Sequence, residues 1–316
     1  MIKKISFTCV LLMATLLPFH GFSFDKKPVD HVYSIMHDGL KRTYLLHSPD
    51  NLEKGKSVPL LIALHGKLGT GKLMVKLTCK KFNTLADKEG FIVVYPDGID
   101  KSWNDGRPIK SKPNKINDSI IDDVGFISAL IDELIKTHCV DPARVYVTGM
   151  SNGAMMTQRL AIELSDKIAA AAPVCGNIPV DLKSTPKNSV AMLIINGTAD
   201  PLVPYEGGEV HFLNMKVGKV TSTVESVNFW VSNNKINNSP KFDYLPDTNP
   251  ADGCRVKRTS YGNIGEKGEV VLITIEGGGH TWAGGMQYAH KMWIGKTCRD
   301  INACDMIWEF CKQHSK

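Results

Sequence analysis

Short apolar runs that alternate with helical patterns constrain the fold of this chain more than any other feature. The runs are continuous and are bounded by Gly, Pro and Asp. Such runs are typical of parallel strands that are buried on both faces of a sheet. The expected strands are Leu60–Leu64, Phe91–Tyr95, Arg144–Thr148, Ile168–Val174, Val190–Ile195 and Val270–Ile275.

Helical patterns fill the spaces between several of these runs. Asp123 can cap a helix whose apolar positions from Phe126 to Ile135 repeat with a period near 3.6. Another helix is expected directly after Ser151. Strand–helix alternation predicts an α/β fold with a mostly parallel, doubly wound sheet.

Two polar, loop-rich segments interrupt this alternation, at residues 100–121 and 235–268. We expect them to be insertions at the rim of a site or plain surface loops. Residues 24–316 are otherwise expected to form a single catalytic domain, a size that one large α/β domain commonly reaches.

The N-terminus has the pattern of a cleaved signal peptide. Lys3 and Lys4 precede an apolar run, Cys9–Leu17, and the small residues Gly21–Ser23 follow it. The run is shorter than the roughly 20 residues that span a bilayer. Residues 1–23 are therefore the expected signal peptide, and the mature protein is predicted to be secreted or periplasmic, without a membrane span.

The charge pattern gives no support to nucleic-acid binding. The formal net charge is +6, and Lys and Arg do not gather into a stripe with interleaved aromatic residues.

The cysteines fit an exported protein. Of eight, Cys9 falls in the expected signal peptide, and an oxidising compartment permits disulfides among the others. A local disulfide that anchors the last helix is suggested by the trio Cys298, Cys304 and Cys311. Cys254 is a further candidate partner. The pairing stays open, and an odd count leaves one thiol unpaired. Zinc is disfavoured because close C-x-x-C pairs are missing.

The candidate nucleophile is Ser151, in Gly149-Met150-Ser151-Asn152-Gly153. This G-x-S-x-G follows an expected strand and precedes an expected helix. A sharp turn at that junction lifts the serine hydroxyl above the sheet, and glycines on both sides avoid clashes. A Gly/Ser turn that merely opens a helix is the alternative interpretation.

A serine nucleophile needs a general base and an acid that orients the base. In folds of this type the chain order is Ser, then Asp or Glu, then His. His280 follows the strand Val270–Ile275 through three glycines, and Asp200 lies just past the strand Val190–Ile195. A surface-loop histidine and an Asp-Pro turn are the plainer interpretations of these two residues.

The oxyanion of the reaction needs two backbone donors. We expect them to be the N–H groups of Lys67 and Asn152, because the turn Leu64-His65-Gly66-Lys67 follows an early strand. His65 is expected to support this turn through hydrogen bonds and is grouped with the substrate-binding residues.

These blocks together resemble the polyhydroxybutyrate depolymerase / feruloyl esterase family of secreted esterases. The resemblance covers roughly residues 40–310. One of its blocks contains Asp200, the candidate acid. The blocks that carry it are Leu64-His65-Gly66, Trp103-Asn104-Asp105-Gly106, Gly149–Gly153 with Met155-Met156, Asn196–Asp200 with Val203-Pro204-Tyr205, and Gly277–Trp282.

The resemblance implies an α/β-hydrolase fold, no metal or other cofactor, and ester hydrolysis through an acyl-enzyme. It maps the nucleophile, acid and base to Ser151, Asp200 and His280. Trp103 and Trp282 match family tryptophans, which implies that they line the pocket, although ordinary packing explains them equally well.

The function predicted from sequence is therefore hydrolysis of feruloyl, acetyl or hydroxyalkanoate esters, with a small or oligomeric ester as the partner. A peptidase or thioesterase that uses the same triad is one alternative, because one fold supports several chemistries. A non-catalytic binding protein of the same fold is the other.

Overall fold

The computed structural model describes residues 31–316 except 51, 54, 109–114, 117–118 and 213–214. The expected signal peptide, residues 1–23, lies outside the described residues. Within the described part of the chain, no helix is long and apolar enough to cross a membrane.

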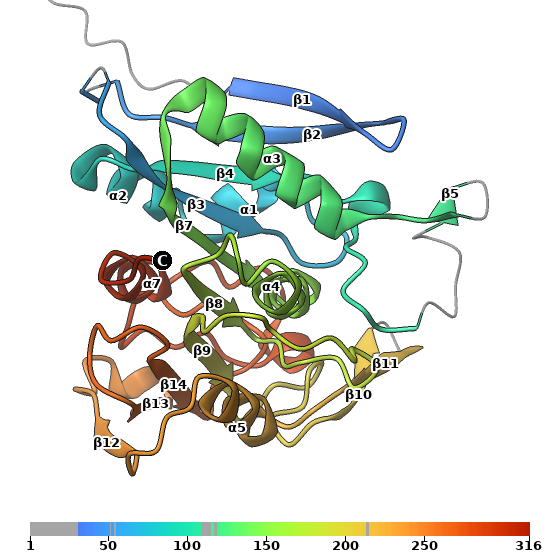
Figure 1. The fold of residues 1–316 in the computed structure, drawn as a ribbon. Helices are drawn as coiled ribbons and strands as arrows, with labels where there is room; N and C mark the ends of the chain where they lie inside the picture. The colour runs from blue at the N-terminus through green and yellow to red at the C-terminus, as the bar shows by residue number, and fades with distance from the viewer. Residues whose placement is uncertain (1–30, 51, 54, 109–114, 117–118, 213–214) are drawn as a thin grey trace, which may run out of the picture.

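A ten-stranded sheet forms the centre of the molecule (Figure 1). The strands from β4 to β14 in spatial order are parallel, and the strands at both edges are antiparallel, which confirms a mostly parallel sheet. In spatial order the strands are β1 (His31–His37), β2 (Leu40–His47), β4 (Ile92–Pro96), β3 (Val58–Leu64), β7 (Val140–Met150), β8 (Ala170–Val174), β9 (Ala191–Gly197), β14 (Val270–Glu276), β13 (Arg255–Tyr261) and β12 (Lys241–Tyr244).

Helices cover both faces of this sheet, which confirms the doubly wound arrangement. One face packs against α1 (Gly71–Leu77), α2 (Lys81–Glu89) and α7 (Ala303–Cys311). The other packs against α3 (Asp123–His138), α4 (Asn152–Glu163) and α5 (Thr223–Asn233), which lie in front of the sheet in Figure 1. The central strands β3, β4, β8 and β9 are buried throughout, because helices cover them on both sides.

Smaller elements lie outside the main sheet. These are two short hairpins, one short helix and two 3₁₀ turns. They are β5 (Lys115–Ile116) with β6 (Ser119–Ile120), β10 (Gly208–Phe212) with β11 (Met215–Val220), α6 (Lys291–Ile294), and the 3₁₀ turns η1 (Ile99–Lys101) and η3 (Pro250–Asp252).

The cap of α3 differs from the sequence prediction by one residue. Asp122 is the N-cap, and its side chain accepts a hydrogen bond from the Gly125 N–H at 2.8 Å. Asp123 is instead the first helical residue and is buried. Its carboxylate binds the Arg42 guanidinium at 2.6 Å and the Asn104 N–H at 2.7 Å. The Asp123 carboxylate, which was expected to cap the helix, is therefore held by residues that are distant in the chain.

The segment 235–268 forms sheet edge as well as loop. It contains β12 and β13, which extend the sheet beyond β14. The side chains of β12 are all exposed, and Val256 is the one buried side chain of β13. One-sided strands with mixed polar residues do not give the continuous apolar run from which the other strands were predicted.

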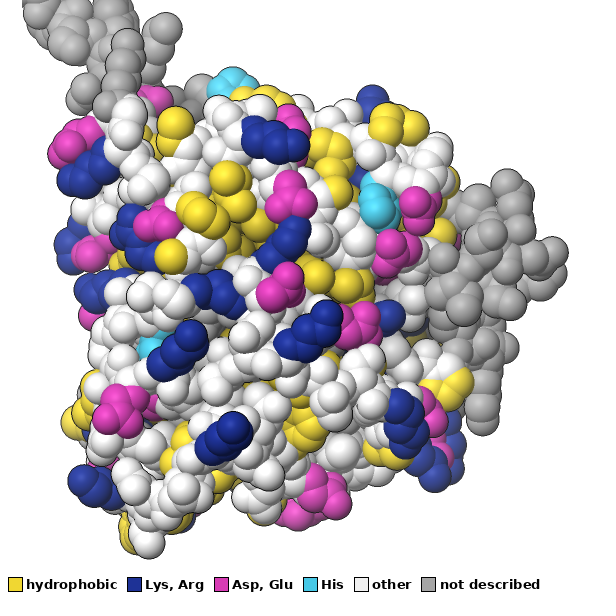
Figure 2. All heavy atoms as spheres, viewed as in Figure 1, with side chains coloured by type: hydrophobic (Ala, Val, Ile, Leu, Met, Phe, Trp, Pro, Cys, Tyr) yellow, Lys and Arg dark blue, Asp and Glu magenta, His cyan; other side chains and the backbone are white. Residues whose placement is uncertain are grey.

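Charged residues are dispersed over the face shown in Figure 2. Lys and Arg side chains lie among Asp and Glu side chains there, without a continuous patch of either sign.

Candidate active site

Ser151 occupies the turn between β7 and α4. Its backbone has φ 59° and ψ −120°, outside the conformations that side chains favour. A Cβ on Gly149 would lie 2.5 Å from the Gly153 oxygen, and one on Gly153 would lie 2.5 Å from the His65 oxygen. Only glycine fits at either position, so the G-x-S-x-G pattern follows from the tightness of this turn.

The turn after β3 lies directly against Ser151. A Cβ on Gly66 would be 3.4 Å from the Ser151 Cβ. Hydrogen bonds from Leu68 N–H to the Lys101 oxygen, 2.8 Å, and from Gly69 N–H to the Gly66 oxygen, 2.9 Å, fix the turn. Within the described residues, the backbone N–H groups of Lys67 and Asn152 donate to no acceptor. Two N–H groups on either side of Ser151 are therefore available to a ligand.

His280 and Asp200 form a close buried pair. The His280 Nδ1 lies 2.7 Å from the Asp200 Oδ2, and the side chains are 3% and 2% exposed. The His280 N–H donates to the Ile294 oxygen at 2.6 Å, and the Tyr288 hydroxyl donates to the His280 oxygen at 2.9 Å. The histidine loop is thus held through its backbone as well as its ring.

Ser151 and His280 line the same cavity, but within the described residues no hydrogen bond joins their side chains. Such contacts are often long in free enzymes and shorten when substrate binds. The three residues singled out in the sequence are therefore brought to one site, with the histidine–aspartate contact formed.

A buried thiol that sequence reasoning missed lies beneath this pair. Cys175 follows β8, and its Sγ donates to the Thr281 oxygen at 3.3 Å. Burial and the neighbouring Asp200 carboxylate raise the pKa of this thiol well above its ordinary value. Cys175 is therefore a neutral packing group that supports the loop carrying His280.

His65 supports the oxyanion turn from below. Its Nδ1 donates to the Gly66 oxygen at 2.7 Å, and its Nε2 accepts from the Gly98 N–H at 3.0 Å. These two bonds select the neutral ring, and burial lowers the pKa of His65. The Trp103 Nε1 donates to the His65 oxygen at 2.9 Å, which ties a third segment to the turn.

The side chain of Asn152 joins the nucleophile turn to the segment around Trp103. Its Oδ1 accepts from the Trp103 N–H at 2.8 Å, and its Nδ2 donates to the Trp103 oxygen at 3.0 Å and to the Asp105 Oδ2 at 2.7 Å. Sequence reasoning used only the Asn152 backbone. The Trp-Asn-Asp block before the nucleophile was the available signal for this contact.

The cavity over Ser151 has a volume of about 1010 Å³ and is mostly apolar. Trp103 and Trp282 are 1% and 0% exposed, and neither is among the residues that line it. Trp282 packs edge-on against Phe82, with ring centroids 6.0 Å apart. Beyond the residues named from the sequence, the lining includes Leu68, Leu73, Met74, Leu77, Leu202, Phe212, Met286, Tyr288, Trp293 and Ile294.

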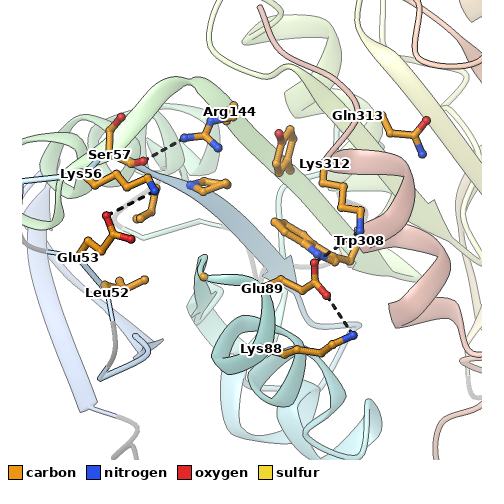
Figure 3. Close-up of a pocket in the computed structure, with 14 residues that line it drawn as sticks. Leu52, Glu53, Lys56, Ser57, Lys88, Glu89, Arg144, Trp308, Lys312 and Gln313 are labelled. Carbon is orange, nitrogen blue, oxygen red and sulfur yellow. Dashed lines mark hydrogen bonds and ion pairs between the residues drawn. The ribbon is translucent and has the colours of Figure 1, made fainter.

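A second cavity, of about 660 Å³, opens at the amino ends of β3 and β7 (Figure 3). Its charged groups are paired with one another. Lys56 lies 3.5 Å from Glu53, Lys88 lies 3.2 Å from Glu89, and Arg144 donates to the Ser57 oxygen at 3.0 Å. Within the described residues, no histidine lines this cavity.

Three groups of side chains in the described part of the chain have atoms close enough to share a metal ion. One consists of Cys175, Asp200 and His280, whose polar atoms already bind one another. The others are Asp252 with Cys254 and Cys298, and the partly exposed set of His37, Asp38 and Asp122.

The chain matches the family model described as esterase PHB depolymerase over residues 43–202. It is 31% identical to "Putative esterase NocK" of Nocardia uniformis subsp. tsuyamanensis, over 86% of this chain and 79% of that protein. It is 27% identical to "Feruloyl esterase B" of Piromyces equi, over 87% of this chain but only 45% of that longer protein.

Among solved structures, the acetyl xylan esterase from Aspergillus awamori superposes with a TM-score of 0.53 at 19% identity. The match covers 83% of this chain and 98% of that one. This likeness shows the α/β-hydrolase fold, in agreement with the sheet and helix layers described above.

Proposed function

The chain belongs to the esterase PHB depolymerase family and is a serine esterase, and on this premise we propose that Ser151, His280 and Asp200 form its catalytic triad. The observation that carries the proposal is the 2.7 Å contact of Asp200 with His280, which lines the same cavity as Ser151, a residue held in a strained turn. The fold accounts for each position, because the three residues follow the carboxyl ends of β7, β9 and β14, which are parallel strands of one sheet.

In the acylation step, the Ser151 oxygen attacks the ester carbonyl while His280 Nε2 takes the serine proton. Asp200 accepts the hydrogen bond from His280 Nδ1 and stabilises the imidazolium that forms. The N–H groups of Lys67 and Asn152 bind the oxyanion, and each donor contributes on the order of 3 kcal/mol to the transition state. The imidazolium then protonates the leaving alcohol, and the acyl group stays on Ser151.

In the deacylation step, His280 takes a proton from water, whose oxygen attacks the acyl carbon. The second tetrahedral intermediate collapses, the proton returns to Ser151, and the carboxylic acid leaves. No further reactant is needed for this sequence.

The substrates we propose are feruloyl, acetyl or hydroxyalkanoate esters, small or oligomeric. The apolar cavity supports this choice, because it accommodates an aromatic or aliphatic acyl chain next to Ser151. We also propose that residues 24–316 form one secreted or periplasmic catalytic domain after removal of residues 1–23, as the N-terminal sequence pattern indicates.

The test is turnover of a panel that contains p-nitrophenyl acetate to decanoate, methyl ferulate and a hydroxybutyrate oligomer, by wild type and Ser151→Ala. We expect turnover by wild type and its loss in the variant, with both proteins folded by circular dichroism. A matched control is Ser184→Ala, an exposed serine, which should keep full activity.

Peptidyl and thioester substrates belong in the same panel. If Ser151-dependent turnover were confined to them, the peptidase or thioesterase alternative would replace the ester assignment. Unchanged ester turnover by Ser151→Ala would show that another residue is the nucleophile.

A further inference from the structure

Within the described part of the chain, the lining of the active-site cavity includes two lysines and no acidic side chain. The lysines are Lys67 and Lys76, and the histidines of the lining are His65, His211 and His280. Most of the remaining lining is apolar. A cavity of this composition is suited to an apolar ligand that also carries a negative charge.

Of the two lining lysines, Lys67 is the one whose backbone N–H is proposed above to bind the oxyanion. Lys76 and His211 are exposed, whereas the Lys67 side chain is half-buried, and burial together with Arg107 lowers its pKa. Its Nζ lies 5.7 Å from the centre of the Phe212 ring, which also lines the cavity. The ammonium is therefore partly desolvated within the cavity wall.

Asp105, the carboxylate whose charge acts on Lys67, is already engaged. Asp105 is bound by Arg107 through both of its oxygens, and the Asn152 amide donates to it as well. Within the described residues, Lys67 makes no ion pair. A partly desolvated charge without a partner is costly, and an incoming anion would remove that cost.

We infer that the enzyme prefers esters that carry a free carboxylate, and that the Lys67 ammonium binds this group. The inference rests on the proposed function, since it concerns the substrate of the same site. It assigns Lys67 two roles: its backbone N–H binds the oxyanion, and its side chain selects the substrate.

Two matched substrate pairs test the inference. Monoethyl glutarate and ethyl valerate differ by a carboxylate in place of a methyl group on the acyl side. 4-Acetoxybutanoate and butyl acetate differ in the same way on the alcohol side. The ratio of kcat/KM within each pair is measured by pH-stat for wild type, Lys67→Met, Lys67→Arg and Lys72→Met.

Lys72→Met is the matched control, because Lys72 is an exposed lysine on α1 that does not line the cavity. Both Met variants remove one positive charge, so a general effect of net charge would appear in both. We expect Lys67→Met to lower the anionic-to-neutral ratio about tenfold in at least one pair, since charged hydrogen bonds contribute about 1.5–3 kcal/mol. Lys67→Arg should keep most of the preference, and Lys72→Met all of it.

If the anionic-to-neutral ratio changes for one pair, that pair shows whether the carboxylate binds on the acyl side or on the alcohol side of the ester. Equal ratios in wild type and Lys67→Met for both pairs would overturn the inference, as would an equal fall in Lys72→Met. Failure of the proposed function looks different, because wild type would then hydrolyse neither the neutral nor the anionic member. In that case, calorimetric binding of monoethyl glutarate against ethyl valerate to Ser151→Ala and to its Lys67→Met double variant still decides whether Lys67 binds the carboxylate.

Discussion

One oxygen of Asp200 lies 2.7 Å from the Nδ1 of His280, while the other accepts the N–H groups of Leu202 and Val203 at 2.8 and 2.9 Å. Both oxygens are thus fixed, so the carboxylate cannot rotate away from the ring. An acceptor held in this way keeps the proton on Nδ1 and leaves Nε2 free to accept the serine proton.

Asp200→Asn should therefore leave the fold intact and lower kcat by about 10³- to 10⁴-fold. The amide that replaces the carboxylate cannot accept from Nδ1 and also from both backbone groups, so the wrong tautomer of His280 becomes favoured. Steady-state kinetics on an ester that wild type hydrolyses, with circular dichroism of both proteins, measure this. Glu206→Gln removes an exposed carboxylate near the same loop and should leave kcat unchanged. Comparable losses in the two variants would point to a general effect of charge instead.

Asn152→Ala should lower the free energy of unfolding by about 2–4 kcal/mol, because buried groups of Trp103 and Asp105 lose their partners. Urea denaturation of the variant and of wild type measures the difference. Asn237→Ala, at an exposed position, should stay within about 0.5 kcal/mol of wild type. If the two alanine variants were equally stable, the Asn152 side chain would not be holding the Trp103 segment.

The strands and the nucleophile turn were predictable because their signals are local. The apolar run Leu60–Leu64 and the glycines at 149 and 153 each form a short pattern within a few residues of the chain, although the group that excludes a side chain at Gly153 is the distant His65 oxygen. The position of His280 followed from the fixed order of elements in this fold, once the strand before it was identified.

The contacts that could not be predicted from the sequence join segments that are far apart in the chain. The Asn152 amide binds a segment nearly fifty residues earlier in the chain, and no periodic pattern encodes that pairing. Asp123 satisfies the same capping rule as Asp122, and only the buried Arg42 decides between them. Strand β13, which lies between β14 and the edge strand β12, was missed because Val256 is its one buried side chain and no continuous apolar run marks it.

His65 should make the protein less stable to acid. Burial lowers its pKa below the ordinary value of 6.5, so the unfolded chain binds this proton more readily than the folded protein does. The stabilisation of the fold that comes from the neutral His65 ring is complete above pH 6.5. It is lost as the pH falls towards the lowered pKa of His65. Thermal unfolding between pH 7.5 and 5 should show a steeper fall for wild type than for His65→Gln.

The glutamine variant provides the comparison because other histidines titrate equally in both proteins. It cannot make both ring hydrogen bonds, so its stability at pH 7.5 should be lower than that of wild type. Parallel pH profiles for the two proteins would contradict the assignment of a neutral, buried ring to His65.

Cys254 and Cys298 are the thiols that should pair when the protein is oxidised. Their sulfur atoms lie within 4.8 Å of each other and of an Asp252 oxygen, and the hydrogen bond from Cys254 lowers the pKa of Cys298. Both residues are buried, and all the described cysteines are free thiols in the structure. Exchange with a disulfide oxidant such as oxidised glutathione would join them, because the oxidant takes up two electrons and the two thiol protons and leaves as two glutathione thiols.

This bond would anchor the segment that supports the proposed general base. The Ile294 and Lys296 oxygens accept the backbone N–H groups of His280 and Gly279, and Cys298 follows two residues later. Oxidation should therefore raise the free energy of unfolding by about 3–4 kcal/mol and slow the loss of activity on heating. Peptide mapping under non-reducing conditions identifies the pair, and Cys139→Ser, at an exposed cysteine, should keep the gain in stability. A Cys254→Ser/Cys298→Ser protein that gained as much on oxidation would show that another pair, for example Cys304 with Cys311, is responsible instead.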